Sequence, residues 1–299
     1  MDMSDRICLV TGSNSGIGKE TARSLARMNA TVIMLVRNKE RGDSARNEIV
    51  ADTGNQNVEV MVADLLSLKE IRRFVAEYRS SHDRLDVLIN NAGGIFSKRE
   101  LTDDGNEYTI ALNYLAPFYL THEMLGLLSS SPSARVVNVA SAAHTRGKIN
   151  LDDFQNKKFG FLRAYGTAKL MNIMFTYELA RRLSGTGITV NAVHPGFVNT
   201  NFGKKDASRV RIAMMKLISR IGRSPEEGAQ TSIYLASSPE VEGISGKYYA
   251  DCKEHESSTI SYNVELQDAL WAKTEETLGI NSSAYISAIM KPTKVSSTH

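Results

Sequence analysis

The chain has 299 residues, of which 42% are hydrophobic and 23% are charged, and this composition is that of an ordinary globular protein. Lys and Arg number 36 against 33 Asp and Glu, and neither a clustered basic stripe nor a recognition motif is present, so we exclude nucleic acid as a partner. The two cysteines cannot form a disulfide framework, no basic leader opens the chain, and no stretch approaches the ~20 apolar residues of a membrane span. We therefore expect a cytoplasmic protein without a transmembrane segment.

Short apolar, β-branched runs alternate along the chain with segments of helical period. In chain order, the predicted elements are a strand at Ile7–Val10, a helix at Ile17–Met28, a strand at Val32–Val36, a helix at Lys39–Ala51, a strand at Val58–Val62, a helix at Leu68–Ser80, a strand at Val87–Ile89, a helix at Asn106–Leu128, a strand at Val136–Val139, a helix at Ala164–Leu183, a strand at Ile188–Val193 and a weaker strand at Lys247–Tyr249. Continuous apolar runs are typical of strands buried on both faces, and the alternation of strands with helices implies right-handed crossovers. The sequence therefore predicts an α/β protein with a doubly wound parallel sheet of about seven strands.

No linker rich in Gly, Ser or Pro, no internal repeat and no change of composition divides the chain before its tail. We therefore predict a single domain over residues 1–255, followed by a C-terminal extension and frayed tail over residues 256–299. Cys8 lies in the first apolar run, where we expect a small core residue rather than a reactive thiol.

A glycine-rich segment lies between the first predicted strand and the first predicted helix. Glycines there let the backbone turn tightly and approach a pyrophosphate, and the N-terminus of the following helix favours negative charge. The placement predicts a dinucleotide site, with a plain tight turn as the alternative. The residues assigned to this site are Gly12, Ser13, Asn14, Ser15, Gly16, Ile17 and Gly18.

The spacing Gly-x-x-x-Gly-x-Gly in this segment resembles the signature of the short-chain dehydrogenase/reductase family, and further motifs follow at the intervals typical of that family. The resemblance covers most of the chain before the C-terminal extension and implies a Rossmann-type fold that binds a nicotinamide dinucleotide. Asn29 stands where relatives usually have glycine, and Asn is the next best residue for a left-handed helix cap. The further motifs are Asn90-Asn91-Ala92-Gly93, Asn113, Ser141, Tyr165-Gly166-Thr167-Ala168-Lys169 and His194-Pro195-Gly196-Phe197-Val198-Asn199-Thr200.

The end of the second predicted strand indicates which dinucleotide is used. A carboxylate there would hydrogen-bond the ribose 2′-OH of NAD and repel a phosphate, whereas this chain has Arg37. A guanidinium can pair bidentately with a 2′-phosphate and stack on adenine, so we predict NADP(H), with a merely solvated arginine as the alternative. The resemblance implies no metal, and it assigns further cofactor contacts to Asn38, Asp64, Leu65, Asn91, Ala92, Gly93, Pro195, Gly196, Val198 and Thr200.

A Tyr-x-x-x-Lys pair provides the candidate acid and base. Tyr165 and Lys169 are four residues apart and share one face of a predicted helix, with an ordinary amphipathic surface as the alternative. A free tyrosine titrates near ~10, and a neighbouring ammonium together with the positive nicotinamide ring of the oxidised cofactor would lower the pKa of Tyr165 by favouring the phenolate. The resemblance further implies that Lys169 holds the nicotinamide ribose. It also implies that Ser141 hydrogen-bonds the substrate oxygen and that Asn113 anchors a water.

Three further segments resemble the retinol-dehydrogenase-like branch of the family. The resemblance to that branch implies a lipophilic aldehyde, ketone or alcohol as the substrate. The segments are Gly18-Lys19-Glu20-Thr21-Ala22, Lys148-Ile149-Asn150-Leu151-Asp152-Asp153-Phe154 and Tyr249-Ala250-Asp251-Cys252.

Residues 199–223 fall where the family has its substrate lid, and their apolar positions share one helical face. Residues 204–223 hold seven Lys and Arg residues against the single acid Asp206. A basic amphipathic helix can lie on a membrane surface, but the apolar faces of soluble helices usually pack inward. We therefore predict a lid over an apolar pocket and keep peripheral membrane contact through 204–223 as the alternative.

The helices predicted at Asn106–Leu128 and Ala164–Leu183 have apolar residues on more than one face. Helices of that kind are buried, either by the core or by a partner. Because the family often pairs these two helices across a two-fold axis, we predict a homodimer.

The motifs together predict an oxidoreductase that transfers a hydride between NADP(H) and a lipophilic aldehyde or ketone, or the corresponding alcohol, with Tyr165 as general acid and base. A catalytically silent NADP(H)-binding regulator on the same fold is the alternative, although a sensor has no need of the complete catalytic set. A sugar-nucleotide epimerase would need a different glycine pattern and a larger C-terminal domain. The sequence predicts only packing for His194 and assigns no role to His122 or His144.

Overall fold

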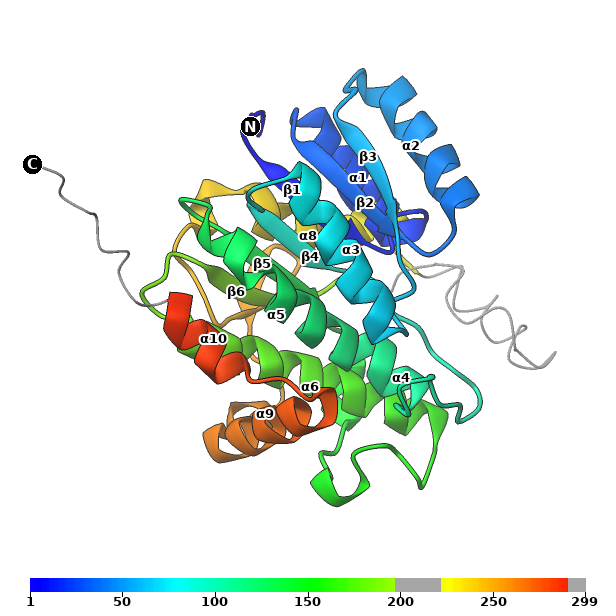
Figure 1. Cartoon of the computed structure of the whole chain (residues 1–299), viewed down its shortest axis with the longest axis vertical. Helices are drawn as coiled ribbons and strands as arrows, with labels where there is room; N and C mark the ends of the chain where they lie inside the picture. The colour runs from blue at the N-terminus through cyan, green and yellow to red at the C-terminus, as the bar shows by residue number, and fades with distance from the viewer. Residues whose placement is uncertain (197–221, 290–299) are drawn as a thin grey trace, which may run out of the picture.

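The computed structural model describes residues 1–196 and 222–289, and the strands in these ranges form one eight-stranded sheet between layers of helices (Figure 1). Its strand order is β3-β2-β1-β4-β5-β6-β7-β8, and all neighbours are parallel except β7 and β8. The predicted doubly wound Rossmann-type sheet is therefore confirmed, with one strand more than expected. The strands are β1 (Ile7–Thr11), β2 (Thr31–Val36), β3 (Val58–Val62), β4 (Val87–Asn90), β5 (Arg135–Val139), β6 (Thr189–His194), β7 (Tyr248–Ala250) and β8 (Lys253–His255).

Helices cover both faces of this sheet. They are α1 (Gly16–Arg27), α2 (Lys39–Thr53), α3 (Leu68–Ser81), α4 (Tyr108–Ile110), the π-helical η1 (Ala111–Leu115), α5 (Ala116–Ser129), the 3-10 turns η2 (Ala142–Arg146) and η3 (Leu151–Asp153), α6 (Phe161–Arg182), α8 (Pro225–Ser237), η5 (Pro239–Val241), η6 (Thr259–Tyr262), α9 (Val264–Leu278) and α10 (Ser282–Ile289). One face packs against α1, α2 and α8, and the other packs against α3, α5 and α6 (Figure 1). Outside this second layer, α9 lies on α6 and α10 lies on α5.

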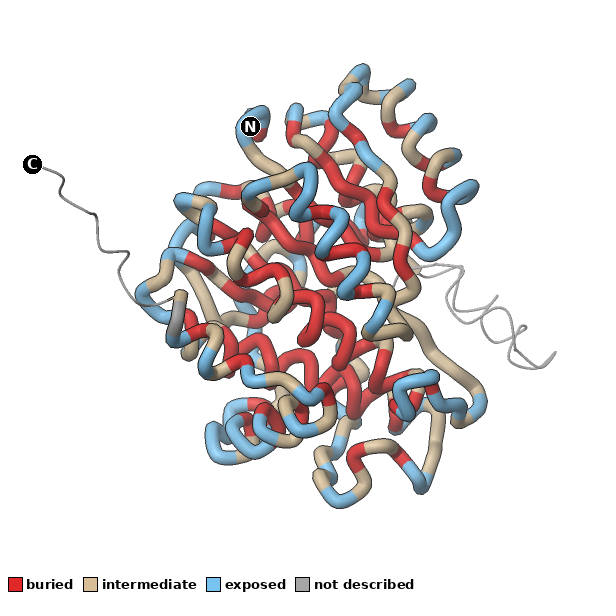
Figure 2. The backbone as a smooth tube through the Cα atoms, viewed as in Figure 1, coloured by how far each residue is buried: buried red, intermediate tan, exposed pale blue. Residues whose placement is uncertain are grey.

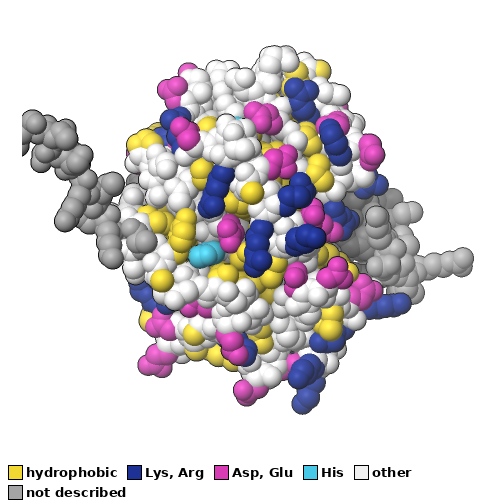
Figure 3. All heavy atoms as spheres, viewed as in Figure 1, with side chains coloured by type: hydrophobic (Ala, Val, Ile, Leu, Met, Phe, Trp, Pro, Cys, Tyr) yellow, Lys and Arg dark blue, Asp and Glu magenta, His cyan; other side chains and the backbone are white. Residues whose placement is uncertain are grey.

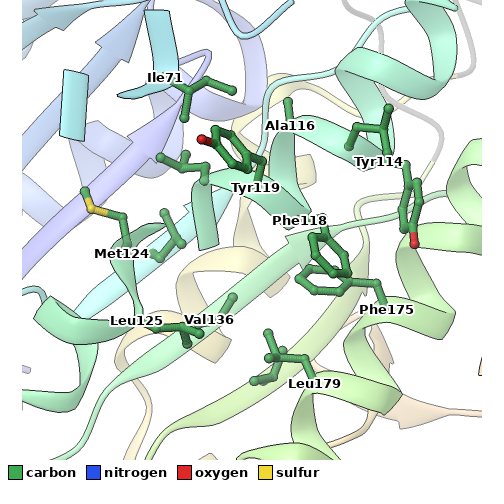
Figure 4. Close-up of a cluster of buried hydrophobic side chains, with 14 of the residues drawn as sticks. Ile71, Tyr114, Ala116, Phe118, Tyr119, Met124, Leu125, Val136, Phe175 and Leu179 are labelled. Atoms are coloured by element: carbon green, nitrogen blue, oxygen red, sulfur yellow. The ribbon is translucent and has the colours of Figure 1, made fainter. Parts of the chain in front are cut away.

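Alternate residues of each strand serve the two faces, so both helix layers share the same strands. Leu9 belongs to the cluster beneath α3, α5 and α6, whereas Cys8 belongs to the cluster beneath α1, α2 and α8. Buried residues run through the centre of the molecule (Figure 2), and Phe118 and Phe175 meet in the larger cluster with ring centroids 4.9 Å apart (Figure 4). Burial on both faces explains the continuous apolar runs, and the predicted core position of Cys8 is confirmed.

The strand that the sequence did not predict is β8. Its residues are exposed, and Lys-Glu-His has no apolar alternation. A two-residue turn at Asp251 and Cys252 joins it to β7, with φ of 51° and 57°. Two consecutive left-handed residues are typical of the tightest hairpins, but the usual signal is Asp-Gly or Asn-Gly, and here a cysteine stands in place of the glycine.

The helix boundaries agree with prediction within a few residues up to α6. The helix expected at Asn106–Leu128 begins at Tyr108 and contains the π-helical turn η1. Asn29, after α1, has a φ of 66°, so the predicted left-handed cap is confirmed. Among the residues that the structure describes, the α-helices that were not predicted are α8, α9 and α10, and the last two lie in the C-terminal extension. Residues 290–299 lie outside the described residues.

The helices α9 and α10 cover the pair on which the homodimer prediction was based. Trp271 of α9 packs against Phe118 of α5 and Phe175 of α6, with ring centroids 4.7 Å and 6.0 Å away. The hydroxyls of Tyr114 and Thr274 share a hydrogen bond of 2.6 Å. The apolar residues of α5 and α6 are therefore buried within a single chain, and the homodimer stays a prediction.

On the face that Figure 3 shows, Lys and Arg side chains are interspersed with Asp and Glu side chains. Across residues 1–196 and 222–289, no helix combines the length and the apolar character that crossing a bilayer requires. The cytoplasmic location stays a prediction.

Trp271→Ala tests how much α9 contributes to the fold. The indole is 3% exposed and Arg182 lies 4.4 Å from its ring centre, so its removal leaves a cavity beside Phe118. We expect the free energy of unfolding to fall by about 3–5 kcal/mol, the usual range for a buried Trp or Phe. Urea unfolding measures the loss, with Val264→Ala, an exposed position on the same helix, as the control. A loss no larger than that of the control would mean that α9 does not stabilise the core.

Candidate active site

The carboxyl ends of β1, β4, β5 and β6 lie along one edge of the sheet, because these strands are parallel. The strand order reverses between β1 and β4, and ligands of doubly wound sheets bind at such a switch point. The topology therefore brings four segments that are distant in sequence to one edge. They are the glycine-rich segment after β1, residues 91–93 after β4, Ser141 after β5, and Pro195 with Gly196 after β6.

Two glycines, Gly12 and Gly18, allow the loop after β1 to pack closely against the loop after β4. Gly12 has a φ of 66°, in the region that side chains rarely adopt. A Cβ on Gly18 would lie 2.4 Å from Nδ2 of Asn91 and 2.6 Å from the carbonyl oxygen of Gly12. Asn91 in turn donates from Nδ2 to the carbonyl of Thr11 at 2.8 Å. A side chain at position 18 would therefore push the two loops apart.

The same loop offers the polar groups that a pyrophosphate needs. Ser13 is fully buried, and its Oγ has no hydrogen-bond partner among the described residues. A buried hydroxyl without a partner destabilises the folded state, and a hydrogen bond to a ligand oxygen would remove that penalty. Helix α1 begins at Gly16 with no acidic residue in its first turn, and Ser15 at its N-cap is exposed. Asn14 and Ile17 are half-buried beside it. These residues fit the phosphates of a dinucleotide.

The residues predicted to bind the adenosine half follow β2 and β3. Arg37 is exposed, and its guanidinium has no ion-pair partner within the part of the chain that the structure describes. Asn38 caps α2 with its side-chain oxygen, and Asp64 accepts a hydrogen bond of 3.0 Å from a backbone N–H of its own turn. Leu65 is half-buried beside it. All four lie at the edge that carries the glycine-rich loop.

The π-helical turn η1 holds Asn113 against the loop after β4. The side chain is fully buried, and its Nδ2 donates to the carbonyls of Gly94 and Thr109 at 2.8 Å each. Its Oδ1 accepts from the N–H of Gly94 at 3.1 Å. A Cβ on Gly93 would lie 2.8 Å from this Oδ1 and 3.5 Å from Nζ of Lys169. Asn113, Gly93 and Lys169 are therefore neighbours.

The predicted catalytic residues Ser141, Tyr165 and Lys169 also come together. A side-chain hydrogen bond joins Ser141 and Tyr165, and Nζ of Lys169 lies 5.7 Å from the centre of the Tyr165 ring. Lys169 is 3% exposed and donates to the carbonyl of Val139 at 2.8 Å. Burial raises the pKa of Tyr165 to about 12 against the lowering effect of Ser141, and it lowers the pKa of Lys169 to about 7. In the protein alone the pKa of Tyr165 is thus raised, because burial disfavours the phenolate, and the lowering predicted with the oxidised cofactor bound stays a prediction.

The last predicted segment is described only in part. Pro195 and Gly196 follow β6 and are half-buried, and the side chain of Arg223 lies next to Gly196. Val198, Thr200 and all but the last two residues of the predicted lid at 199–223 lie outside the described residues.

Two histidines that the sequence left without a chemical role lie against the Ser141 turn. Nδ1 of His144 is 2.8 Å from the carbonyl oxygen of Ser141, and Nδ1 of His194 is 3.3 Å from the backbone N of Ala142. The sequence could have indicated only that both histidines are close to Ser141. His144 follows Ser141 by three residues, and His194 ends β6, the strand beside β5.

Comparison with known proteins agrees with this geometry. Residues 6–210 match the family model described as short chain dehydrogenase. The chain belongs to the short-chain dehydrogenase/reductase family. It is 43% identical over 278 residues to retinol dehydrogenase 12 of Bos taurus, covering 92% of this chain and 87% of that protein. It is 41% identical over 283 residues to polyprenol dehydrogenase of Homo sapiens, covering 92% and 86%.

A solved structure of a variant of actinorhodin polyketide ketoreductase with NADPH has a TM-score of 0.65 and 27% identity to the chain, covering 83% of this chain and 96% of that one. The predicted retinol-dehydrogenase-like branch is confirmed by the relatives. This short-chain dehydrogenase/reductase is therefore an oxidoreductase of alcohols or carbonyl compounds with a nicotinamide cofactor.

The lowered pKa of Lys169 makes the stability of the enzyme depend on pH. An unfolded lysine titrates near ~10.4. Between that pH and about 7, the unfolded chain binds a proton that the folded chain does not. The folded state therefore bears a penalty that is fully present below pH 7 and fades as the pH rises. Lys169→Met removes this penalty, so its stability relative to the wild type should fall by a few kcal/mol (about 1.4 per pKa unit) between pH 7 and pH 10.

Urea unfolding of both proteins without nucleotide, at the two pH values, measures this change. Lys253→Met, at an exposed position, is the matched control and should show no such trend. A Lys169→Met difference that is the same at both pH values would contradict the depressed pKa.

Proposed function

We propose that this enzyme transfers a hydride between NADP(H) and a lipophilic aldehyde or ketone, or the corresponding alcohol, with Tyr165 as general acid and base. The observation that carries the proposal is the cluster at the carboxyl edge of the sheet. Ser141 is hydrogen-bonded to Tyr165, and Lys169 lies one turn further along α6. Asn113 and the glycine-rich loop lie at the same edge.

The bound nicotinamide supplies or accepts the hydride, and the residues of the chain handle the proton. During reduction, the Tyr165 hydroxyl donates its proton to the substrate oxygen, which Ser141 holds by a second hydrogen bond. The resulting phenolate is costly if it is buried alone, and an ammonium on Lys169 compensates it. Because burial brings the pKa of Lys169 to about 7, this lysine can gain or lose a proton at neutral pH.

Arg37 supports NADP(H) over NAD(H). It stands at the exposed end of β2, where an acid would repel a 2′-phosphate. We assign the adenosine side of the site to Asp64 and Leu65, which follow β3, and to residues 91–93, which follow β4. NADPH in the related ketoreductase structure adds support.

The relatives support a lipophilic substrate. The names of two relatives specify retinol and polyprenol, and both are apolar alcohols. We propose the same class for this enzyme, with either direction of the reaction available to the catalytic residues. A lid over the substrate, or membrane contact through 204–223, stays a prediction.

Arg37→Asp tests the choice of nucleotide. A charge-assisted hydrogen bond to a phosphate contributes about 1.5–3 kcal/mol, so the affinity for NADPH should fall by ~10- to 100-fold. The affinity for NADH should rise, because the new carboxylate can bind the ribose hydroxyls. Fluorescence titration of both nucleotides measures the two changes, and Lys253→Asp controls for net charge. Equal affinity of the wild type for both nucleotides would refute the assignment.

Tyr165→Phe tests the general acid. Loss of the hydroxyl should leave NADPH affinity close to that of the wild type but lower the turnover of a medium-chain aldehyde by at least ~10²-fold. Tyr234→Phe, on the opposite face of the sheet, is the matched control. A Tyr165→Phe variant that binds NADPH and keeps most of its turnover would show that the assignment is wrong. A wild type that binds NADPH yet turns over no aldehyde or ketone would favour the silent regulator.

A further inference from the structure

A buried histidine holds the turn that carries Ser141. Nδ1 of His144 donates to the carbonyl oxygen of Ser141 at 2.8 Å, and Nε2 of the same ring accepts from the backbone N–H of Ser258 at 3.1 Å. His144 is 3% exposed, and its ring lies edge-on to Tyr248 with centroids 5.2 Å apart. One imidazole therefore ties the Ser141 turn to the C-terminal part of the chain.

These two bonds require one form of the ring. A carbonyl oxygen can only accept and a backbone N–H can only donate, so Nδ1 of His144 carries the proton and Nε2 does not. A doubly protonated ring could not accept from Ser258. Burial lowers the pKa of His144 and so favours the neutral ring. The geometry thus selects the neutral Nδ1–H tautomer.

The same turn is held from two other directions. Nδ1 of His194, at the end of β6, accepts from the N–H of Ala142 at 3.3 Å. The turn also packs closely on α6, since a Cβ on Gly166 would lie 2.7 Å from the carbonyl oxygen of Ala143. Gly166 directly follows Tyr165, so a shift of the turn would change how Ser141 meets that tyrosine.

We propose that His144 is a positioning residue, whose Nδ1–H holds the Ser141 carbonyl so that the Ser141 hydroxyl stays directed at Tyr165 and at the substrate oxygen. This inference rests on the proposed function, in which Ser141 binds that oxygen. A misplacement of about 1 Å in an active site can cost ~10²-fold in rate, so the fixing of this one carbonyl has a measurable consequence.

The competing explanation is that His144 only docks the segment at Ser258. Two substitutions separate the two bonds. His144→Asn places an amide N–H where Nδ1 lies and can still donate to Ser141, but it loses the bond to Ser258. His144→Gln places an amide oxygen where Nε2 lies and can still accept from Ser258, but it loses the bond to Ser141.

The first experiment compares kcat and KM of these variants with a medium-chain aldehyde and NADPH. His144→Leu removes both side-chain bonds and leaves only the backbone N–H of residue 144 on the Ser141 carbonyl, at 3.0 Å, so kcat should fall by about ten-fold with little change in NADPH affinity. His144→Asn should recover most of that loss, and His144→Gln should not. Equal kcat values for the Asn and Gln variants, or a higher value for Gln, would overturn the positioning role. A wild-type protein that shows no turnover would overturn the proposed function itself. That outcome is distinct from a failure of the positioning role, which requires an active wild type.

The second experiment repeats His144→Leu in a Ser141→Ala background. If His144 acts through Ser141, the further loss in kcat should be less than about two-fold, because the positioned hydroxyl is already absent. A full ten-fold loss in this background would show that the histidine acts on the fold in general.

The third readout needs no substrate. Nitrogen-15 NMR of histidine-labelled protein should show a neutral Nδ1–H ring that is missing from the His144→Asn spectrum. A ring at position 144 protonated on Nε2 alone would contradict the geometry on which the inference depends.

Discussion

The parallel pairing of β1 with β4 is the constraint on which the rest of this structure depends. Residues 8–10 of β1 pair with residues 87–89 of β4, and all are buried, so a slip by one residue would exchange the two faces of the core. Because the strands are parallel, the chain leaves both at the same edge and returns through a helix. The two loops meet so closely that a Cβ on Gly12 would lie 3.0 Å from Cα of Ala92. The candidate active site lies at this edge because the pairing of β1 with β4 brings its loops together there.

Burial, which the sheet and its helices impose, also sets the pKa values of the proposed catalytic residues Tyr165 and Lys169. Lys169 projects from α6 toward the end of β5, where it donates to the carbonyl of Val139 and lies beside Asn113. In that place burial disfavours its ammonium, and burial likewise disfavours the phenolate of Tyr165, which the hydrogen bond with Ser141 favours. Each charge is unfavourable when it is buried alone and is stabilised when the opposite charge lies next to it.

The C-terminal extension completes the fold in two places. Helix α9 packs Trp271 against Phe118 of α5 and Phe175 of α6, so it buries part of the apolar surface of both helices. The segment before it places the N–H of Ser258 on His144, which holds the Ser141 turn. Residues that follow the catalytic motifs by about a hundred positions therefore contribute both to the core and to the geometry of the site.

The sequence by itself determined the doubly wound sheet, the glycine-rich loop and the Tyr165–Lys169 pair. Burial on both faces leaves continuous apolar runs, and residues four apart share a helix face whatever surrounds them. Only the tertiary structure decided the pKa of Tyr165, the hairpin strand β8 and the position of His144. A pKa depends on everything packed around the group, β8 forms on a turn that lacks the usual glycine, and Ser258 lies 114 residues from His144. Contacts between segments so far apart in the sequence produce no local residue pattern from which they could be predicted.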